Sequence, residues 1–187
     1  PQVKAVLQSW VDANAAGWAE YRFGAGRTVS DMTMLTIGTG VGGAIVSRGS
    51  LFRGGFGAGA ELGHLRIVPD GLPCGCGAHG CIEQYGSGRA LLRMANEIAD
   101  VGGIGLALAD ARREHGQLDG SIVGALIADG DPGAVHALEQ LGNWLGHACA
   151  SLSAVLDPEL FVFGGGVAVA GELLLAPVRE AYRQHVP

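Results

Sequence analysis

Residues 32–46 read Met-Thr-Met-Leu-Thr-Ile-Gly-Thr-Gly-Val-Gly-Gly-Ala-Ile-Val. The apolar and β-branched run over residues 32–37 predicts a strand, and residues 44–46 begin a second one. The glycines of residues 38–43 supply the turn between the two strands, because glycine tolerates backbone angles that other residues avoid. This stretch therefore predicts a β-hairpin with a glycine-rich turn.

The segments around this hairpin predict an α/β domain of packed layers. Short apolar runs bounded by turn residues indicate further strands over residues 50–53, 65–68 and 160–163. Apolar residues at helical spacing indicate helices over residues 13–23, 90–99, 122–128, 132–156 and 171–185. Because no linker or repeat interrupts this order, we expect the elements to build one layered domain.

The sequence at the start of the chain predicts its secondary structure less clearly than the segments described above. Residues 3–11 indicate a short strand or a loop, and Asp12 then resembles the N-cap of the helix over residues 13–23. A carboxylate at that position is most often a cap, although it is also a candidate for acid–base chemistry.

The composition describes a globular chain and excludes several classes of partner. Of the 187 residues, 48% are hydrophobic and 16% are charged, which is enough to build a core. The net charge of -6 predicts no nucleic-acid partner. No apolar run approaches the roughly 20 residues of a membrane span, and the first residues show no signal-peptide pattern. We therefore expect no membrane partner.

The densest group of metal-binding side chains lies between residues 61 and 83. Residues 61–64 read ELGH, and residues 74–83 read CGCGAHGCIE. One histidine and three cysteines complete a tetrahedral zinc site with no position left for water. We therefore predict a structural Zn²⁺ ion in a loop over residues 64–83, held by His64, Cys74, Cys76 and Cys81.

Other interpretations of this cluster are weaker. Cys74 and Cys76 are too close in sequence for an easy disulfide, and three cysteines leave one unpaired. His79 competes with His64 as the fourth ligand, but it lies inside a segment that the flanking cysteines already constrain. Cys149, on an apolar helical stretch, is predicted to be a buried small hydrophobic residue. Clustered cysteines without a disulfide framework favour a reducing, cytoplasmic location.

Two glycine-rich turns are candidates for holding phosphates or a nucleoside. In residues 38–43, backbone N–H groups and a threonine hydroxyl are suited to an anion, although a plain hairpin explains the same pattern. No lysine follows the glycines, so this is not a Walker motif. Residues 164–166, three glycines after a buried strand, allow the backbone to pass close to a base or ribose. A tight turn between strand and helix explains them equally well.

Taken together, these motifs resemble the ROK family of bacterial sugar kinases and related repressors, within the actin-like ATPase superfamily. The resemblance is closest to its zinc-containing glucokinases and is carried by residues 12–14, 35–43, 61–64, 74–83 and 164–167. It implies an α/β fold, namely an actin-like ATPase (RNase H-like) lobe with a mixed sheet, helices and a zinc-binding loop.

The resemblance also implies an activity and a role for each motif. The implied reaction is ATP-dependent phosphorylation of the 6-hydroxyl of glucose, with ATP, Mg²⁺ and a structural Zn²⁺ ion as cofactors. Asp12 matches the catalytic base. The matches to sugar-binding residues are Glu61, His64 and Glu83. The matches to nucleotide-binding residues are Gly38, Thr39 and Gly40 at the phosphates and Gly164, Gly165 and Gly166 at the adenosine.

The chain departs from the family pattern near its start. Trp10 and Val11 stand where the family has Glu-Asn, which removes one sugar contact. The Asp-x-Gly-x-Thr turn of the family's small lobe does not occur in this sequence. We therefore expect a fragment truncated at both ends, with residues 1–11 ending the small lobe or hinge and residues 12–187 forming the large C-terminal lobe. By this hypothesis the chain alone turns over sugar poorly.

Other functions stay open at the level of sequence. One is phosphorylation of another hexose, such as mannose, fructose or an N-acetylhexosamine. Another is a ROK-type sugar-sensing repressor, which needs an upstream helix-turn-helix. A third is a catalytically silent zinc-stabilised subunit. The family resemblance also implies a homodimer.

Overall fold

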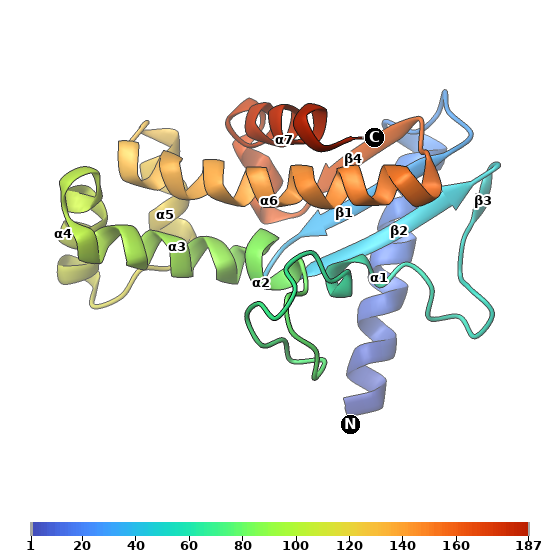
Figure 1. Cartoon of the computed structure of the whole chain (residues 1–187), viewed down its shortest axis with the longest axis horizontal. Coiled ribbons are helices and arrows are strands. Elements are labelled where there is room, and N and C mark those ends of the chain that lie inside the picture. Colours follow the sequence, from blue (N-terminus) through green and yellow to red (C-terminus); the bar gives the residue numbers. More distant parts are fainter. Residues whose placement is uncertain (1, 187) are drawn as a thin grey trace.

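A computed structural model describes the backbone of residues 2–186 and the side chains of residues 13–186 (Figure 1). The helices are α1 (Gln2–Phe23), α2 (Glu83–Gly86), α3 (Gly88–Val101), α4 (Leu106–His115), α5 (Gly120–Ala128), α6 (Pro132–Leu156) and α7 (Glu172–His185). The strands are β1 (Met32–Ile37), β2 (Val41–Ser47), β3 (Ser50–Leu51) and β4 (Leu160–Gly164). Three short 3₁₀ turns are η1 (Leu62–His64), η2 (Gly103–Gly105) and η3 (Gly166–Ala170).

The four strands form one mixed sheet in the order β3-β2-β1-β4. The hairpin of β1 and β2 is antiparallel, as the glycine-rich turn predicted, and β4 runs parallel to β1 with Thr36 opposite Gly164. Because β1 and β4 are parallel, their carboxyl ends meet at the same edge of the sheet. The glycine-rich turns that follow these two strands therefore begin at the same edge.

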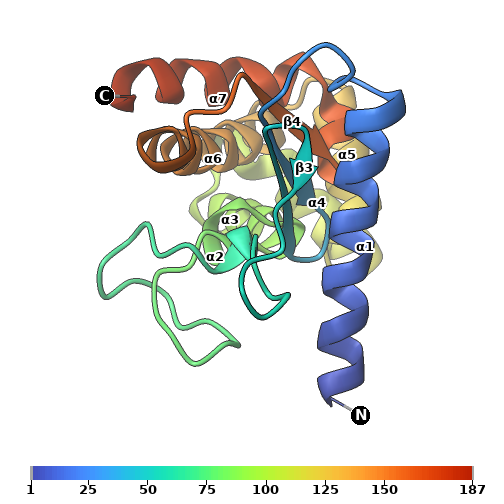
Figure 2. The same cartoon turned by 90° about the vertical axis from the view of Figure 1, so that its right-hand side faces the viewer.

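Helices cover both faces of this sheet. Alternate residues of β1 divide between two cores, because successive side chains of a strand point to opposite faces. Met32 and Met34 face α1 and pack with Trp18, whereas Leu35 and Ile37 belong to the larger core built on α3 and α6. Figure 2 shows α1 on one side of the sheet and α6, with α7 above it, on the other. The predicted α/β layering is confirmed.

Local signals set where the main helices begin. The side chains of Ser87, Asp119 and Asp131 accept backbone N–H groups at the starts of α3, α5 and α6. Such caps satisfy N–H groups that the helix itself leaves unpaired. The long helix α6 spans the residues predicted for it. None of the described helices is both long enough and apolar enough to cross a lipid bilayer.

Three expectations about local structure are wrong. Residues 3–11 are helical, because α1 begins at Gln2 and no glycine or proline interrupts the chain before Gly17. Asp12 therefore lies inside α1 and is not an N-cap. Residues 65–68 form only a single antiparallel bridge, between Arg66 and Cys81, rather than a strand. The helix α4 was not predicted, since its short polar sequence has a weak apolar stripe.

Candidate functional site

Glu61 and His64 are held beside the sheet by the short turn η1. The N–H of His64 donates to the carbonyl of Glu61 at 3.0 Å, and the intervening Leu62 is buried. A Cβ atom at Gly63 would lie only 2.1 Å from the carbonyl oxygen of Val41 on β2. Only glycine therefore lets η1 pack so closely against the strand, and this contact fixes where both side chains project.

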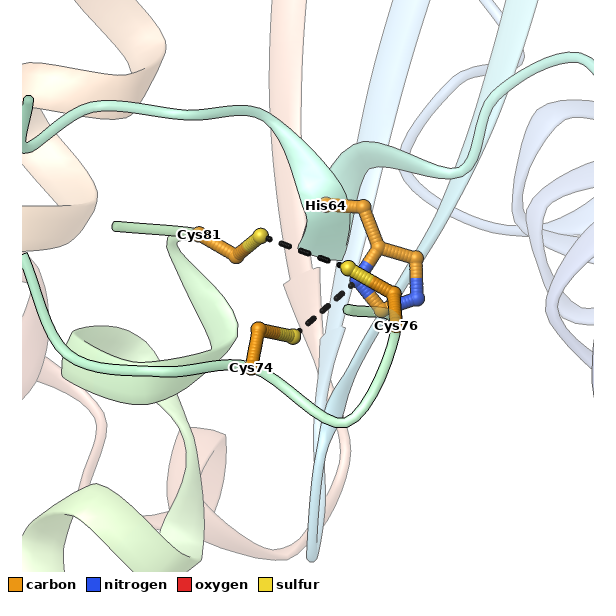
Figure 3. Close-up of side chains that lie close together, drawn as sticks. All are labelled: His64, Cys74, Cys76 and Cys81. Carbon is orange, nitrogen blue, oxygen red and sulfur yellow. Dashed lines mark hydrogen bonds between the residues drawn. The ribbon is translucent and has the colours of Figure 1, made fainter. Parts of the chain in front are cut away.

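The structure brings His64 together with Cys74, Cys76 and Cys81, as Figure 3 shows. Their ligand atoms all lie within 4.8 Å of one another. The Nδ1 atom of His64 is 3.6 Å from the Sγ atom of Cys74, and the Sγ atoms of Cys76 and Cys81 are 3.7 Å apart. For Zn–S bonds of about 2.3 Å and Zn–N bonds of about 2.1 Å, a tetrahedral site has N–S edges of about 3.6 Å and S–S edges of about 3.8 Å. This donor set and spacing fit zinc.

The two ring nitrogens of His64 face different surroundings. The Nδ1 atom faces the thiols, and the other ring nitrogen points away from the sulfur atoms (Figure 3). His79 is not in the cluster; it is exposed, and its carbonyl accepts a hydrogen bond from Arg66. Cys149 also lies outside the cluster, inside α6, where burial raises the pKa of its thiol to about 12. It is therefore an unreactive core residue, as predicted.

Two features outside this cluster hold the loop of residues 64–83, which carries the candidate metal ligands and is called the metal-binding loop below. Gly80 has a φ angle of +77°, and a Cβ atom there would lie 1.7 Å from the carbonyl oxygen of Val68. The hydroxyl of Tyr85 accepts the N–H of Leu72 at 2.8 Å, and its ring packs on Trp144. Sequence reasoning missed Tyr85, although a buried tyrosine generally needs a partner for its hydroxyl.

Replacing Gly80 with alanine is expected to weaken zinc binding by about tenfold or more, because a left-handed φ angle and the clash with Val68 strain the loop. Gly75→Ala is the matched control: it lies between two of the cysteines, and no atom comes within 4 Å of a Cβ placed there. Competition with a chromogenic chelator measures both affinities. Equal affinities for the two variants would show that the Gly80 conformation does not support the metal site.

Glu83 joins the metal-binding loop to the first glycine turn. Its side chain is 17% exposed, and its Oε2 atom accepts the N–H of Val41 at 3.3 Å. Glu61 lies close enough for its charge to interact with those of His64 and Glu83. Burial raises the pKa of the Glu61 carboxyl; the charge of His64 opposes this shift, and that of Glu83 adds to it. The three residues assigned to sugar binding therefore form one polar group.

The two glycine turns line a single cavity of about 700 Å³. Gly38 and Thr39 contribute from the first turn and Gly166 from the second, and the parallel pairing of β1 and β4 brings these turns together. The remaining walls are mostly apolar or small and come from α3, α5, α6 and the segment after Gly166. Small-molecule sites typically enclose about 300–1,000 Å³ and have mainly apolar walls.

The other nucleotide-site candidates lie beside this cavity rather than in its wall. A Cβ atom at Gly40 would meet the Glu83 carboxylate at 2.3 Å, so the turn touches the polar group directly. Gly164 ends β4, and Gly165 leads into η3. The lining residues that sequence reasoning missed include Arg89, Ser121 and Gly124. Only their place in the fold identifies them, since each lies in an ordinary helical sequence.

The side chain of Asp12 lies outside the described residues, but its neighbours are described. A Cβ atom at Gly42 would lie 3.2 Å from the Cβ atom of Ala13, so α1 passes next to the first glycine turn. The Oδ1 atom of Asn14 is buried without a hydrogen-bond partner among the described residues. The backbone of residues 12–14 is therefore near the first glycine turn, which also contacts Glu83.

Comparison with known proteins gives a consistent assignment. The ROK family model matches residues 3–187. A glucokinase from Streptomyces coelicolor is 43% identical over 177 residues, covering 92% of this chain and 55% of that protein. An N-acetylmannosamine kinase from Citrobacter koseri is 38% identical over 173 residues, covering 92% of this chain and 53% of that protein. The chain thus spans about half the length of these relatives.

A solved structure shows the same fold. The ROK family glucokinase from Streptomyces griseus, crystallised with glucose and AMPPNP, superposes with a TM-score of 0.86 at 44% identity. The superposition covers 94% of this chain and 57% of that one.

Proposed function

Because this chain belongs to the ROK family, we propose that the protein is an ATP-dependent hexose kinase that phosphorylates the 6-hydroxyl of glucose. One observation supports this proposal above the others. Glu83, a member of the polar group with Glu61 and His64, contacts Gly40 and Val41. These two residues directly follow Gly38 and Thr39, which line the apolar cavity. A donor and an acceptor for a phosphoryl group would lie side by side there, which is the main requirement of phosphoryl transfer.

The cavity is suited to the nucleotide. Its apolar walls fit the flat faces of an adenine, and Gly166 allows the backbone to lie close to the nucleoside. Gly38, Thr39 and Gly40 would then hold the phosphates, together with a Mg²⁺ ion that neutralises part of their charge. Phosphates extending along this turn would approach Glu83, and so the hexose.

The polar group is suited to a hexose. The carboxylates of Glu61 and Glu83 would accept hydrogen bonds from sugar hydroxyls. A zinc ion held by His64 and the three cysteines would be structural, because four protein ligands leave no coordination site for substrate. With Nδ1 on the metal side, the other ring nitrogen of His64 has a fixed position and tautomer and would bond a further hydroxyl.

Asp12 would act as the general base. Its neighbour Ala13 lies beside the first glycine turn, so a carboxylate here would be near the attacking hydroxyl. It would accept the proton of the 6-hydroxyl as that oxygen attacks the γ-phosphorus. In this proposal residues 1–11 end the small lobe or hinge and residues 12–187 form the large lobe of a cytoplasmic, homodimeric enzyme.

The second candidate substrate is N-acetylmannosamine, which the similarity to the Citrobacter koseri kinase favours. Coupled measurement of ADP release from the purified full-length protein, with glucose, mannose, fructose and N-acetylmannosamine, tests both candidates. We expect the highest kcat/KM with glucose, by about tenfold or more over the other sugars. A preference for N-acetylmannosamine would reassign the substrate. The absence of sugar-dependent ADP release from the full-length protein would refute the proposed activity.

A further inference from the structure

Arg89 joins the two halves of the proposed site. Its Nε atom donates to the carbonyl of Thr39 at 3.0 Å, and its Nη2 atom lies 3.5 Å from Oε1 of Glu83. The guanidinium group thus bridges the first glycine turn and a residue assigned to the hexose.

The charge of Arg89 stands out in its surroundings. Among the described residues that line the cavity, it is the only one with a charged side chain. The chain as a whole has a net charge of -6, so repulsion would otherwise oppose a polyanionic ligand. Within the described part of the chain, its Nη1 atom makes no hydrogen bond or ion pair. A cation with an available donor therefore faces the proposed nucleotide cavity.

The backbone holds Arg89 in this position. It is the second residue of α3, whose N-cap Ser87 accepts the N–H of Ala90 at 3.2 Å. The N–H of Gly88 donates to the carbonyl of Gly38 at 2.8 Å. The first turn of α3 is thus docked directly on the first glycine turn. The positive end of the helix dipole adds to the attraction for an anion there.

We infer that Arg89 binds the phosphate groups of the nucleotide and exchanges its contact with Glu83 for them. The Arg89 side chain is 64% exposed, and an ion pair this open to water contributes little to stability. A phosphate group offers stronger, charge-assisted hydrogen bonds to the same planar guanidinium. The exchange would release Glu83 for a sugar hydroxyl. This inference rests on the proposed function, because it requires a nucleotide in the cavity.

The test compares Arg89→Gln with the unchanged protein in binding adenosine, AMP, ADP and ATP by calorimetry at low salt. The loss of affinity should rise along this series, from less than about twofold for adenosine to about tenfold for ATP. Arg89→Lys should give an intermediate loss, since it keeps the charge without the planar fork. Raising the salt concentration should reduce the difference, because the site is exposed.

Arg93→Gln is the matched control. It removes the guanidinium one turn further along α3, where it pairs with Glu97 and the carbonyl of Gln84 and does not line the cavity. Its affinities should match those of the unchanged protein for all four ligands. If Arg89→Gln weakens the binding of adenosine as much as the binding of ATP, or weakens the binding of neither, the inference is wrong. If the unchanged protein binds none of the four, the proposed function and this inference are refuted together.

Discussion

Cys81→Ser is expected to abolish stoichiometric zinc binding and to lower kcat/KM for glucose by about 100-fold. Cys81 is fully buried at the base of the metal-binding loop, and a serine oxygen is a poor substitute for a zinc-bound thiolate. Without the metal, the ring of His64 and the start of α2, which carries Glu83, lose the anchor that they share. Misplacing substrate contacts by about 1 Å is enough to cost a factor of about 100. Elemental analysis and coupled kinetics measure the two effects.

The control for this variant is Cys149→Ala, which removes the one cysteine that lies outside the cluster. Cys149 is buried in α6 as a small apolar residue. Alanine at this position should therefore leave both the zinc content and kcat/KM within about threefold of the values for the unchanged protein. The metal assignment is wrong if Cys81→Ser still carries one zinc ion per chain. The positioning argument is wrong if that variant loses zinc but keeps its kcat/KM.

Asp12→Asn is expected to lower kcat by a factor of about 10²–10⁴ with little change in KM. The amide has the shape of the carboxylate but cannot take up the hydroxyl proton during transfer. Since the base acts mainly in the transition state, ground-state binding of glucose and ATP should persist. Steady-state kinetics, with zinc content as a check on folding, measure this effect.

Asp131→Asn provides the comparison with an aspartate that has only a structural role. Asp131 caps α6 by accepting the N–H of Ala134 at 2.9 Å, and asparagine caps helices about as well. Its kcat should therefore be unchanged. If Asp12→Asn behaves like Asp131→Asn, a function for Asp12 in proton transfer is excluded.

Local patterns predicted much of the fold. The bounds of α6 followed from Pro132 and a continuous apolar stripe, and the hairpin followed from glycines between two apolar runs. Residues 3–11 were misjudged because their apolar positions fit both a short strand and a helix. Residues 65–68 were misjudged because their antiparallel pairing with the segment around Cys81 is limited to one bridge, at Arg66, and does not extend into a ladder.

The sequence by itself determined that the three candidate cysteine ligands lie together, because they fall within eight residues and short-range chain geometry brings them close. The fold then placed His64, and not His79, beside them. Only the tertiary structure decided that two glycine turns more than 120 residues apart line one cavity. That proximity depends on the parallel pairing of β1 with β4 across the helices between them. The positions of Glu83 and Arg89 against the first turn likewise come from the docking of α2 and α3, which depends on packing between distant segments rather than on local pattern.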